Sequence, residues 1–172
     1  GDESLAGFAC SRSANEDIYM VQKMVRTCFG NNNTDNCARV CHSATVAGLA
    51  KTLGVGAMTN PIYDITHDVD CIFLIGSNPE EAHPVVGLQI RQAVEKGTRL
   101  IVADPRDISL AEKADIHLKL RPGTNVPLVN GLIHVILEEG LEDKEYISKY
   151  TENFEALKEL VRDYTPEKVG EI

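Results

Sequence analysis

The sequence predicts an α/β fold with a three-layer, mostly parallel sheet in a doubly wound, Rossmann-like arrangement. Residues 70–106 show an apolar run, an amphipathic stretch and a second apolar run, which is the pattern of a strand, a crossover helix and a strand. The two runs, "DCIFLIG" and "TRLIVAD", are nearly continuous, as in strands buried on both faces of a parallel sheet. With 172 residues the chain has about the length of one domain, so we expect a single α/β domain over residues 1–172.

The remaining elements follow from local patterns. Before the crossover we expect a strand in "LAGFACS" and a helix in "NEDIYMVQKMVRTCFG", with Asn15 as its candidate N-cap. The crossover helix is expected in "PEEAHPVVGLQIRQAVEKG", which ends at a Lys-Gly pair. Beyond it, "ADIHLKL" alternates like a strand near a sheet edge, and "TNVPLVNGLIHVILEEG" has apolar residues at helical spacing. "DKEYISKYT" and "NFEALKELVRDYT" predict two surface helices, the second ended by Thr165-Pro166.

Composition excludes several classes of function. Hydrophobic residues make up 43% and charged residues 25%, as in ordinary globular proteins. The net charge of -9 argues against nucleic acid as a partner. No apolar run approaches the roughly 20 residues that span a bilayer, so we expect no transmembrane segment. Five cysteines without a C-x-x-C pair indicate reduced thiols. We expect a cytoplasmic location, with any export signal lying before Gly1.

Polar residues follow the predicted strands, where parallel sheets bind ligands. These loops are 11–13, 76–81, 104–106 and 121–125, and they carry Gly, Asn, Asp, Glu and Arg. Glycine allows close backbone approach, carboxylates accept from ribose or guanine, and arginine pairs with phosphate. No G-x-G-x-x-G motif follows the strands, so an ordinary NAD fingerprint is missing. Any one of these loops could be an ordinary turn, and it is their clustering at one sheet edge that indicates a nucleotide-like ligand.

Several linked motifs identify a resemblance to a known family. "SRSANEDIYMVQK", "NNNTDNCARVCHSATVAG", "GAMTNPIYDI", "GSNPEEAHPVV" and "VADPRDISLAEKADIHLKLRPGTNVPLVNGL" occur in that order along nearly the whole chain. Together they resemble the catalytic subunit of molybdenum- or tungsten-dependent formate dehydrogenases of the dimethyl sulfoxide reductase superfamily. The resemblance implies oxidation of formate to carbon dioxide at a Mo or W bis(molybdopterin guanine dinucleotide) centre. It also implies a 4Fe–4S cluster in the full subunit, and electron transfer to further subunits or an acceptor.

The resemblance assigns catalytic roles to two adjacent residues. Cys41 stands at the position of the protein ligand to the metal, where a thiolate is a soft donor. His42 stands at the position of the residue that handles the proton released from formate, and imidazole changes protonation near neutral pH. Without the flanking motifs, an inert thiol and a surface histidine would be the simpler interpretation. Cys37 is expected to serve packing. The remaining histidines of the matched region are expected to be structural: His83, His117 and His134.

The same resemblance assigns cofactor contacts. The residues expected to touch one guanine dinucleotide are Gly76, Asn78, Glu81, Asp104, Arg106, Gly123 and Asn125. Arg12 is expected near the other pterin. Glu81 departs from a familiar Asp, and its longer reach puts direct contact with ribose or guanine in doubt. Arg106 has a structural alternative, a salt bridge to Asp107 or Asp115 that pins the turn.

Parts of the family pattern have no counterpart here. The iron–sulfur cysteine set, a formate-binding arginine and the C-terminal barrel are missing, so we expect an inactive fragment whose partners include the remaining domains of its subunit. Three alternatives stay open. A cysteine-ligated nitrate reductase would resemble "CM" rather than "CH" at residues 41–42. The others are a non-catalytic scaffold that has lost the metal and a plain nucleotide-binding module.

Overall fold

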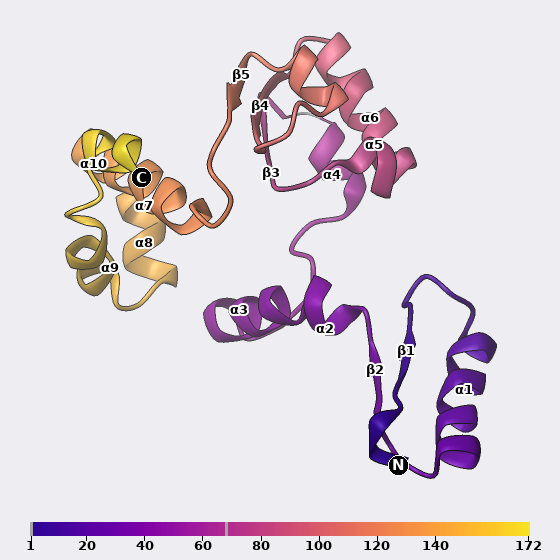
Figure 1. Ribbon diagram of the computed structural model, residues 1–172. Helices are drawn as coiled ribbons and strands as arrows, with labels where there is room; N and C mark the ends of the chain where they lie inside the picture. The colour runs from indigo at the N-terminus through magenta and orange to yellow at the C-terminus, as the bar shows by residue number, and fades with distance from the viewer. Residues whose placement is uncertain (1, 68) are drawn as a thin grey trace. The chain divides into compact units, whose positions relative to one another are not determined.

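The computed structural model describes residues 2–67 and 69–172, and the chain separates into two compact units, Gly1–Thr59 and Asn60–Ile172 (Figure 1). Both units combine helices with short parallel strands, which confirms the predicted α/β class. The expectation of one domain over residues 1–172 stays a prediction. None of the helices in the described ranges is long and apolar enough to cross a membrane.

The first unit is built around a two-stranded parallel sheet. Its elements are a 3₁₀ turn at Asp2–Ser4, β1 (Gly7–Ala9), α1 (Asn15–Met24), a π-helical turn at Val25–Phe29, β2 (Thr34–Asn36), α2 (Ala38–Cys41) and α3 (Ser43–Leu53). Gly7 pairs with Thr34 and Ala9 with Asn36. Val25 is fully buried, and a Cβ on Gly7 would lie 2.4 Å from its Cγ2. Glycine at position 7 therefore lets the strand pack against the end of the helical segment.

The second unit holds a three-stranded parallel sheet in the order β3-β4-β5. Its elements are α4 (Ile62–Thr66), β3 (Cys71–Ile75), α5 (Pro79–Ala82), α6 (Pro84–Glu95), β4 (Arg99–Ala103), a 3₁₀ turn at Ser109–Lys113, β5 (Ile116–Leu118), α7 (Asn125–Glu138), α8 (Lys144–Tyr150), α9 (Phe154–Val161) and α10 (Pro166–Glu171). Ile75 pairs with Ala103, which pairs with Leu118, so the three strands end together.

One face of this sheet forms the main core. Leu100 and Val102 on β4 are fully buried, and Ile72 on β3 pairs with Leu100. They pack with Ile90 of α6 and with other apolar side chains of the same cluster. Each such side chain contributes about 1.5–3 kcal/mol when it leaves water. Phe73 points to the opposite face and is 42% exposed.

The structure corrects the predicted placement of the first strand. β1 pairs with β2 and not with β3, β4 or β5. Only three of the four predicted strand-end loops therefore follow strands of one sheet. β2 has the sequence Thr-Asp-Asn, without the apolar pattern that would have predicted a strand.

The structure also corrects three helix ends. The expected single helix in residues 79–97 is interrupted at His83, because Pro84 disfavours helical backbone in the residue before it. Asn15 is the first residue of α1, and Ala14 occupies the N-cap position without a side-chain hydrogen bond. Thr165 does not end the preceding helix, which stops at Val161; its side chain caps α10.

Candidate functional site

The loop after β3 combines an open glycine with an unpaired acceptor. Gly76 adopts φ +58°, and no atom lies within 4 Å of a Cβ built on it. Its N–H donates to the carbonyl of Ala103 at 2.9 Å, so this loop begins beside the end of β4. Asn78 Oδ1 is buried, and it has no hydrogen-bond partner in the part of the chain that the structure describes. Such an acceptor costs free energy unless a donor reaches it, which marks a place for a ligand N–H or O–H group.

A close helix contact fixes the position of this loop. The Asn78 carbonyl accepts from the N–H of Ala82 at 3.0 Å, which closes α5. Gly87 of α6 is buried, and a Cβ there would lie 2.7 Å from the Glu80 nitrogen and 2.9 Å from the Pro79 carbonyl carbon. Because these are backbone atoms, α5 can rest on α6 only where the side chain is absent.

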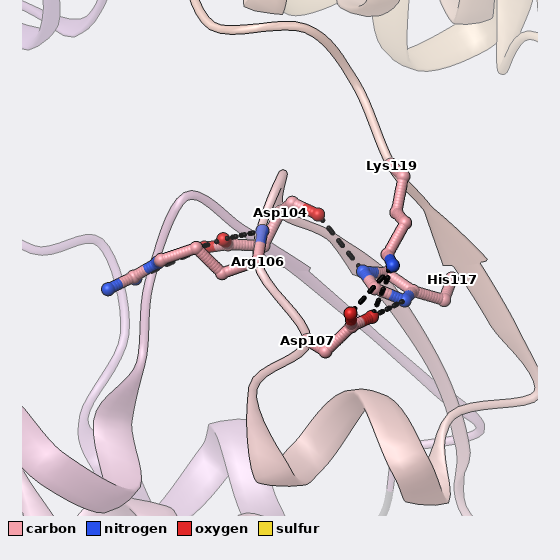
Figure 2. Close-up of polar contacts among 5 residues, drawn as sticks. All are labelled: Asp104, Arg106, Asp107, His117 and Lys119. Carbon is pink, nitrogen blue, oxygen red and sulfur yellow. Dashed lines mark hydrogen bonds and ion pairs between the residues drawn. The ribbon is translucent and has the colours of Figure 1, made fainter.

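The loop after β4 is organised by Asp104 (Figure 2). This side chain is 3% exposed, and its Oδ1 accepts from the Arg106 N–H at 2.8 Å and from Arg106 Nε at 3.2 Å. Burial acts to raise the pKa of Asp104, but the hydrogen bonds from Arg106 outweigh it and the pKa is lowered. The carboxylate is thus held charged inside the loop, with Arg106 as its partner.

The Arg106 guanidinium faces outward from this pair. Its side chain is 62% exposed, and the pKa of Arg106 is raised first by the hydrogen bond to Asp104 and also by the nearby charge of Glu81. Arg106 therefore does pin the turn, although through Asp104 rather than through the expected Asp107 or Asp115. Its exposed N–H groups remain available to an anionic ligand.

His117 of β5 and Lys119, just after that strand, contact the same loop. His117 Nε2 lies 3.0 Å from the Asp104 carbonyl, and Lys119 Nζ lies 2.6 Å from Asp107 Oδ1. In Figure 2 the Arg106 guanidinium points away from the Asp107, His117 and Lys119 side chains. The hydrogen bond between His117 and the Asp104 carbonyl agrees with the structural role expected for His117. The lysine was not singled out by sequence, because a lone alternating Lys on a strand resembles any solvated residue.

The last two predicted dinucleotide residues follow β5. Gly123 adopts φ +91° with open space around it, and Asn125 is the first residue of α7. Thr124 lies between them and donates its hydroxyl to the Arg121 carbonyl at 2.7 Å. The structure thus brings Gly76, Asn78, Glu81, Asp104 and Arg106 to the ends of β3 and β4, and it places the other two on the segment that leaves β5.

Arg12, Cys41 and His42 belong to the first unit. Cys41 is exposed at the end of α2, and His42 is exposed between α2 and α3. The thiol of Cys41 is therefore accessible, as a metal ligand requires. In the described ranges, no group of three or more His, Cys, Asp or Glu side chains could hold a metal ion.

Cys37, for which a packing role is expected, is half-buried and makes polar contacts. Its Sγ accepts a hydrogen bond from the Ser11 N–H at 3.2 Å and lies 3.1 Å from Ser11 Oγ. These contacts lower the pKa of Cys37, with smaller contributions from Cys10 and from the positive charge of Arg12. The predicted residue Arg12 is thus placed near a polarised sulfur.

Comparison with known proteins then assigns the family. A sequence model described as molybdopterin oxidoreductase matches residues 1–161. The chain belongs to the molybdopterin oxidoreductase family. It is 47% identical over 170 residues to the F420-dependent formate dehydrogenase 1 subunit alpha of Methanococcus maripaludis, with 99% of this chain and 25% of that relative covered. A nitrate reductase of Symbiobacterium thermophilum is 37% identical over 182 residues, with 100% of this chain and 24% of that protein covered.

The fold of this molybdopterin oxidoreductase chain is also found in a solved structure. Acetylene hydratase from Pelobacter acetylenicus matches with a TM-score of 0.72 and 31% identity, over 100% of this chain and 23% of the hydratase. The chain therefore spans about a quarter of the length of the relatives that it matches.

Proposed function

We propose that the protein containing this chain oxidises formate to carbon dioxide, and that this chain supplies one metal ligand and part of a dinucleotide site. Support comes from the family and from the formate dehydrogenase relatives. The observation that carries the proposal is the exposed Cys41–His42 pair at the junction of α2 and α3. A soft thiol donor beside an imidazole suits a redox metal and a released proton.

The loops of the second unit fit a pterin guanine dinucleotide. Asn78 Oδ1 has no donor among the described residues, and a guanine N–H or ribose hydroxyl would supply one. Gly76 leaves open space for close approach to its backbone. The Arg106 guanidinium is available to a phosphate. Asp104, whose Oδ1 already accepts two hydrogen bonds from Arg106, would act by holding that guanidinium rather than by touching the ligand.

The remaining predicted residues complete this assignment. Glu81 lies near enough to Arg106 to raise the pKa of the arginine, so the Glu81 carboxylate would act on the guanidinium. Gly123 and Asn125 would contribute an open backbone and an amide from the segment after β5. Arg12 would add positive charge toward the second pterin.

The chemistry divides between the cofactor and this chain. When bound, a molybdenum or tungsten bis(molybdopterin guanine dinucleotide) would supply the capacity to accept two electrons, and a 4Fe–4S cluster elsewhere in the full subunit would supply a route for them to an acceptor. Cys41 would bind the metal through its thiolate. His42 would take the single proton that balances the conversion of formate to carbon dioxide, and pass it on.

A nitrate reductase is the second candidate, because such an enzyme is also a relative. His42 favours formate, since a proton acceptor serves an oxidation that releases a proton. A hydratase has a similar fold, so the fold by itself does not distinguish formate oxidation from other reactions. The assignment depends on residues 41 and 42.

The test uses the full-length protein, purified without air, with formate turnover and metal content as readouts. Cys41→Ala should abolish turnover, and Cys41→Ser should lower it while X-ray absorption shows one metal–sulfur contact fewer. His42→Ala should lower kcat about 10²–10⁴-fold, the range for loss of a general base. Cys71→Ala, at another exposed thiol, is the matched control and should change neither readout. Unchanged turnover in both the Cys41→Ala and His42→Ala variants would refute the proposal, and nitrate reduction without formate oxidation would favour the second candidate.

A further inference from the structure

Two thiols stand at matching positions beyond the paired strands of the first unit. Ala9 of β1 pairs with Asn36 of β2. Cys10 and Cys37 are the residues that directly follow these two strands. The N–H of Cys37 donates to the Ala9 carbonyl at 3.0 Å, so the strand pairing extends to these cysteines. Neighbouring strands run about 4.8 Å apart, within the roughly 4.4–6.8 Å between the Cα atoms of a disulfide.

The two sulfur atoms are already close. Cys37 Sγ lies 3.8 Å from Cys10 Sγ. Within this chain, Cys10 is exposed and Cys37 is half-buried. Hydrogen bonding from Ser11 to Cys37 Sγ favours the thiolate form, which is the attacking species in disulfide exchange. The sulfur of Cys28 has a longer polar contact than that of Cys37, because it lies 3.7 Å from Thr27 Oγ1.

We propose that Cys10 and Cys37 are a reversible dithiol site that is oxidised to a disulfide by a low-molecular-weight disulfide. The Cys37 thiolate attacks one sulfur of the oxidant, so that a mixed disulfide forms and one thiolate leaves. Cys10 then loses its proton to solvent and attacks the Cys37 sulfur, and the second thiolate leaves. Overall, two protein thiols lose two electrons and two protons, and the oxidant becomes two thiols.

The bond would act on the segment that leads to Cys41. The Cys37 carbonyl accepts from the N–H of Val40 at 3.2 Å and from the N–H of Cys41 at 3.0 Å, which makes the first turn of α2. A disulfide would tie the start of this helix to the end of β1, beside Arg12. The dithiol site does not depend on the proposed function, because it stands whether or not Cys41 binds a metal.

The test is a redox titration of the full-length protein. The protein is reduced without air, exposed to oxidised glutathione at neutral pH, alkylated rapidly and digested with trypsin. Cleavage at arginine and lysine separates the peptide that ends at Arg12 from the peptide of residues 27–39, which carries Cys37. The expected product is a cross-link between these two peptides, with a loss of two hydrogens, that disappears on treatment with a dithiol reductant.

Variants identify the sulfurs involved. The peptide of residues 27–39 also contains Cys28, so Cys28→Ser is the matched control and should keep the cross-link. Cys10→Ser should instead accumulate glutathione on Cys37, and Cys37→Ser should lose the cross-link. Cys41→Ala should retain it, which separates this result from any failure of the formate proposal. Free alkylated Cys10 and Cys37 after oxidation, or a cross-link that persists in Cys37→Ser, would overturn the inference.

Discussion

Replacing Gly87 with alanine should destabilise the second unit, although alanine is the better helix former. A Cβ at this position would lie 2.7 and 2.8 Å from the nitrogen and Cα of Glu80, closer than real Cβ atoms approach such atoms. The gain in helix propensity is about 0.5–1 kcal/mol. The contact involves backbone that cannot rotate away, so α5 must shift at a cost of about 1–3 kcal/mol. The difference between these two ranges is a net loss of up to about 2.5 kcal/mol, centred on about 1 kcal/mol.

Urea unfolding followed by circular dichroism measures this loss, and hydrogen exchange of residues 79–95 locates it. Gly48→Ala is the matched control, because Gly48 also lies inside a helix, α3, and has no atom within 4 Å of a built Cβ. This control should be more stable than the original chain by about 0.5–1 kcal/mol. In the holoenzyme, Gly87→Ala should also lower the guanine nucleotide content, since the shift moves Asn78. A Gly87→Ala chain as stable as the Gly48→Ala chain would refute the argument from close packing.

Three further variants test other parts of the structure. Asp104→Asn should make the free energy of unfolding less dependent on pH in the acid range. The pKa of Asp104 is depressed in the folded state, so its contribution to stability is present above the unfolded pKa of about 4 and is lost as pH falls through the lower folded pKa. Urea unfolding at a series of pH values measures this difference. Asp143→Ala removes a side chain that accepts from a backbone N–H at 2.8 Å at the start of α8, and should cost about 1 kcal/mol, seen as faster hydrogen exchange there; equal exchange would contradict the cap. Val25→Ala should cost the first unit about 2 kcal/mol in urea, whereas Val40→Ala, at 85% exposure, should change stability by less than about 0.5 kcal/mol.

The parallel sheet of the second unit was predictable because its chemistry is local. Two apolar runs flanking an amphipathic stretch give strands and a helix wherever they fold, and β3, α6 and β4 lie inside the predicted ranges. The partner of β1 was not predictable in this way. Its pairing with β2 is set by backbone hydrogen bonds between segments that carry no apolar alternation.

The candidate site was predictable to a different extent in each unit. Polar strand ends follow from topology, and the structure brings the residues after β3 and β4 together as expected. The roles of Cys41 and His42 came from resemblance, since a thiol beside an imidazole carries no specific signal by itself. Asn78 Oδ1 has no hydrogen-bond partner where the structure describes the chain, and Asp104 binds Arg106. Both features depend on atomic positions that no residue pattern encodes. The close contact at Gly87 has a signal in the sequence, because a glycine inside a helical pattern often marks a close approach of two backbones.

For the anionic ligand proposed at Arg106, the pairing of Asp104 with Arg106 would affect how fast that ligand leaves. Both groups lie within one turn, so the guanidinium loses much of its rotational freedom when the chain folds and long before an anion arrives. Binding would then cost less side-chain conformational entropy. A ligand bound by an arginine that is already oriented should dissociate more slowly than one bound by a freely rotating arginine. Residence time, more than association rate, should report the integrity of this turn.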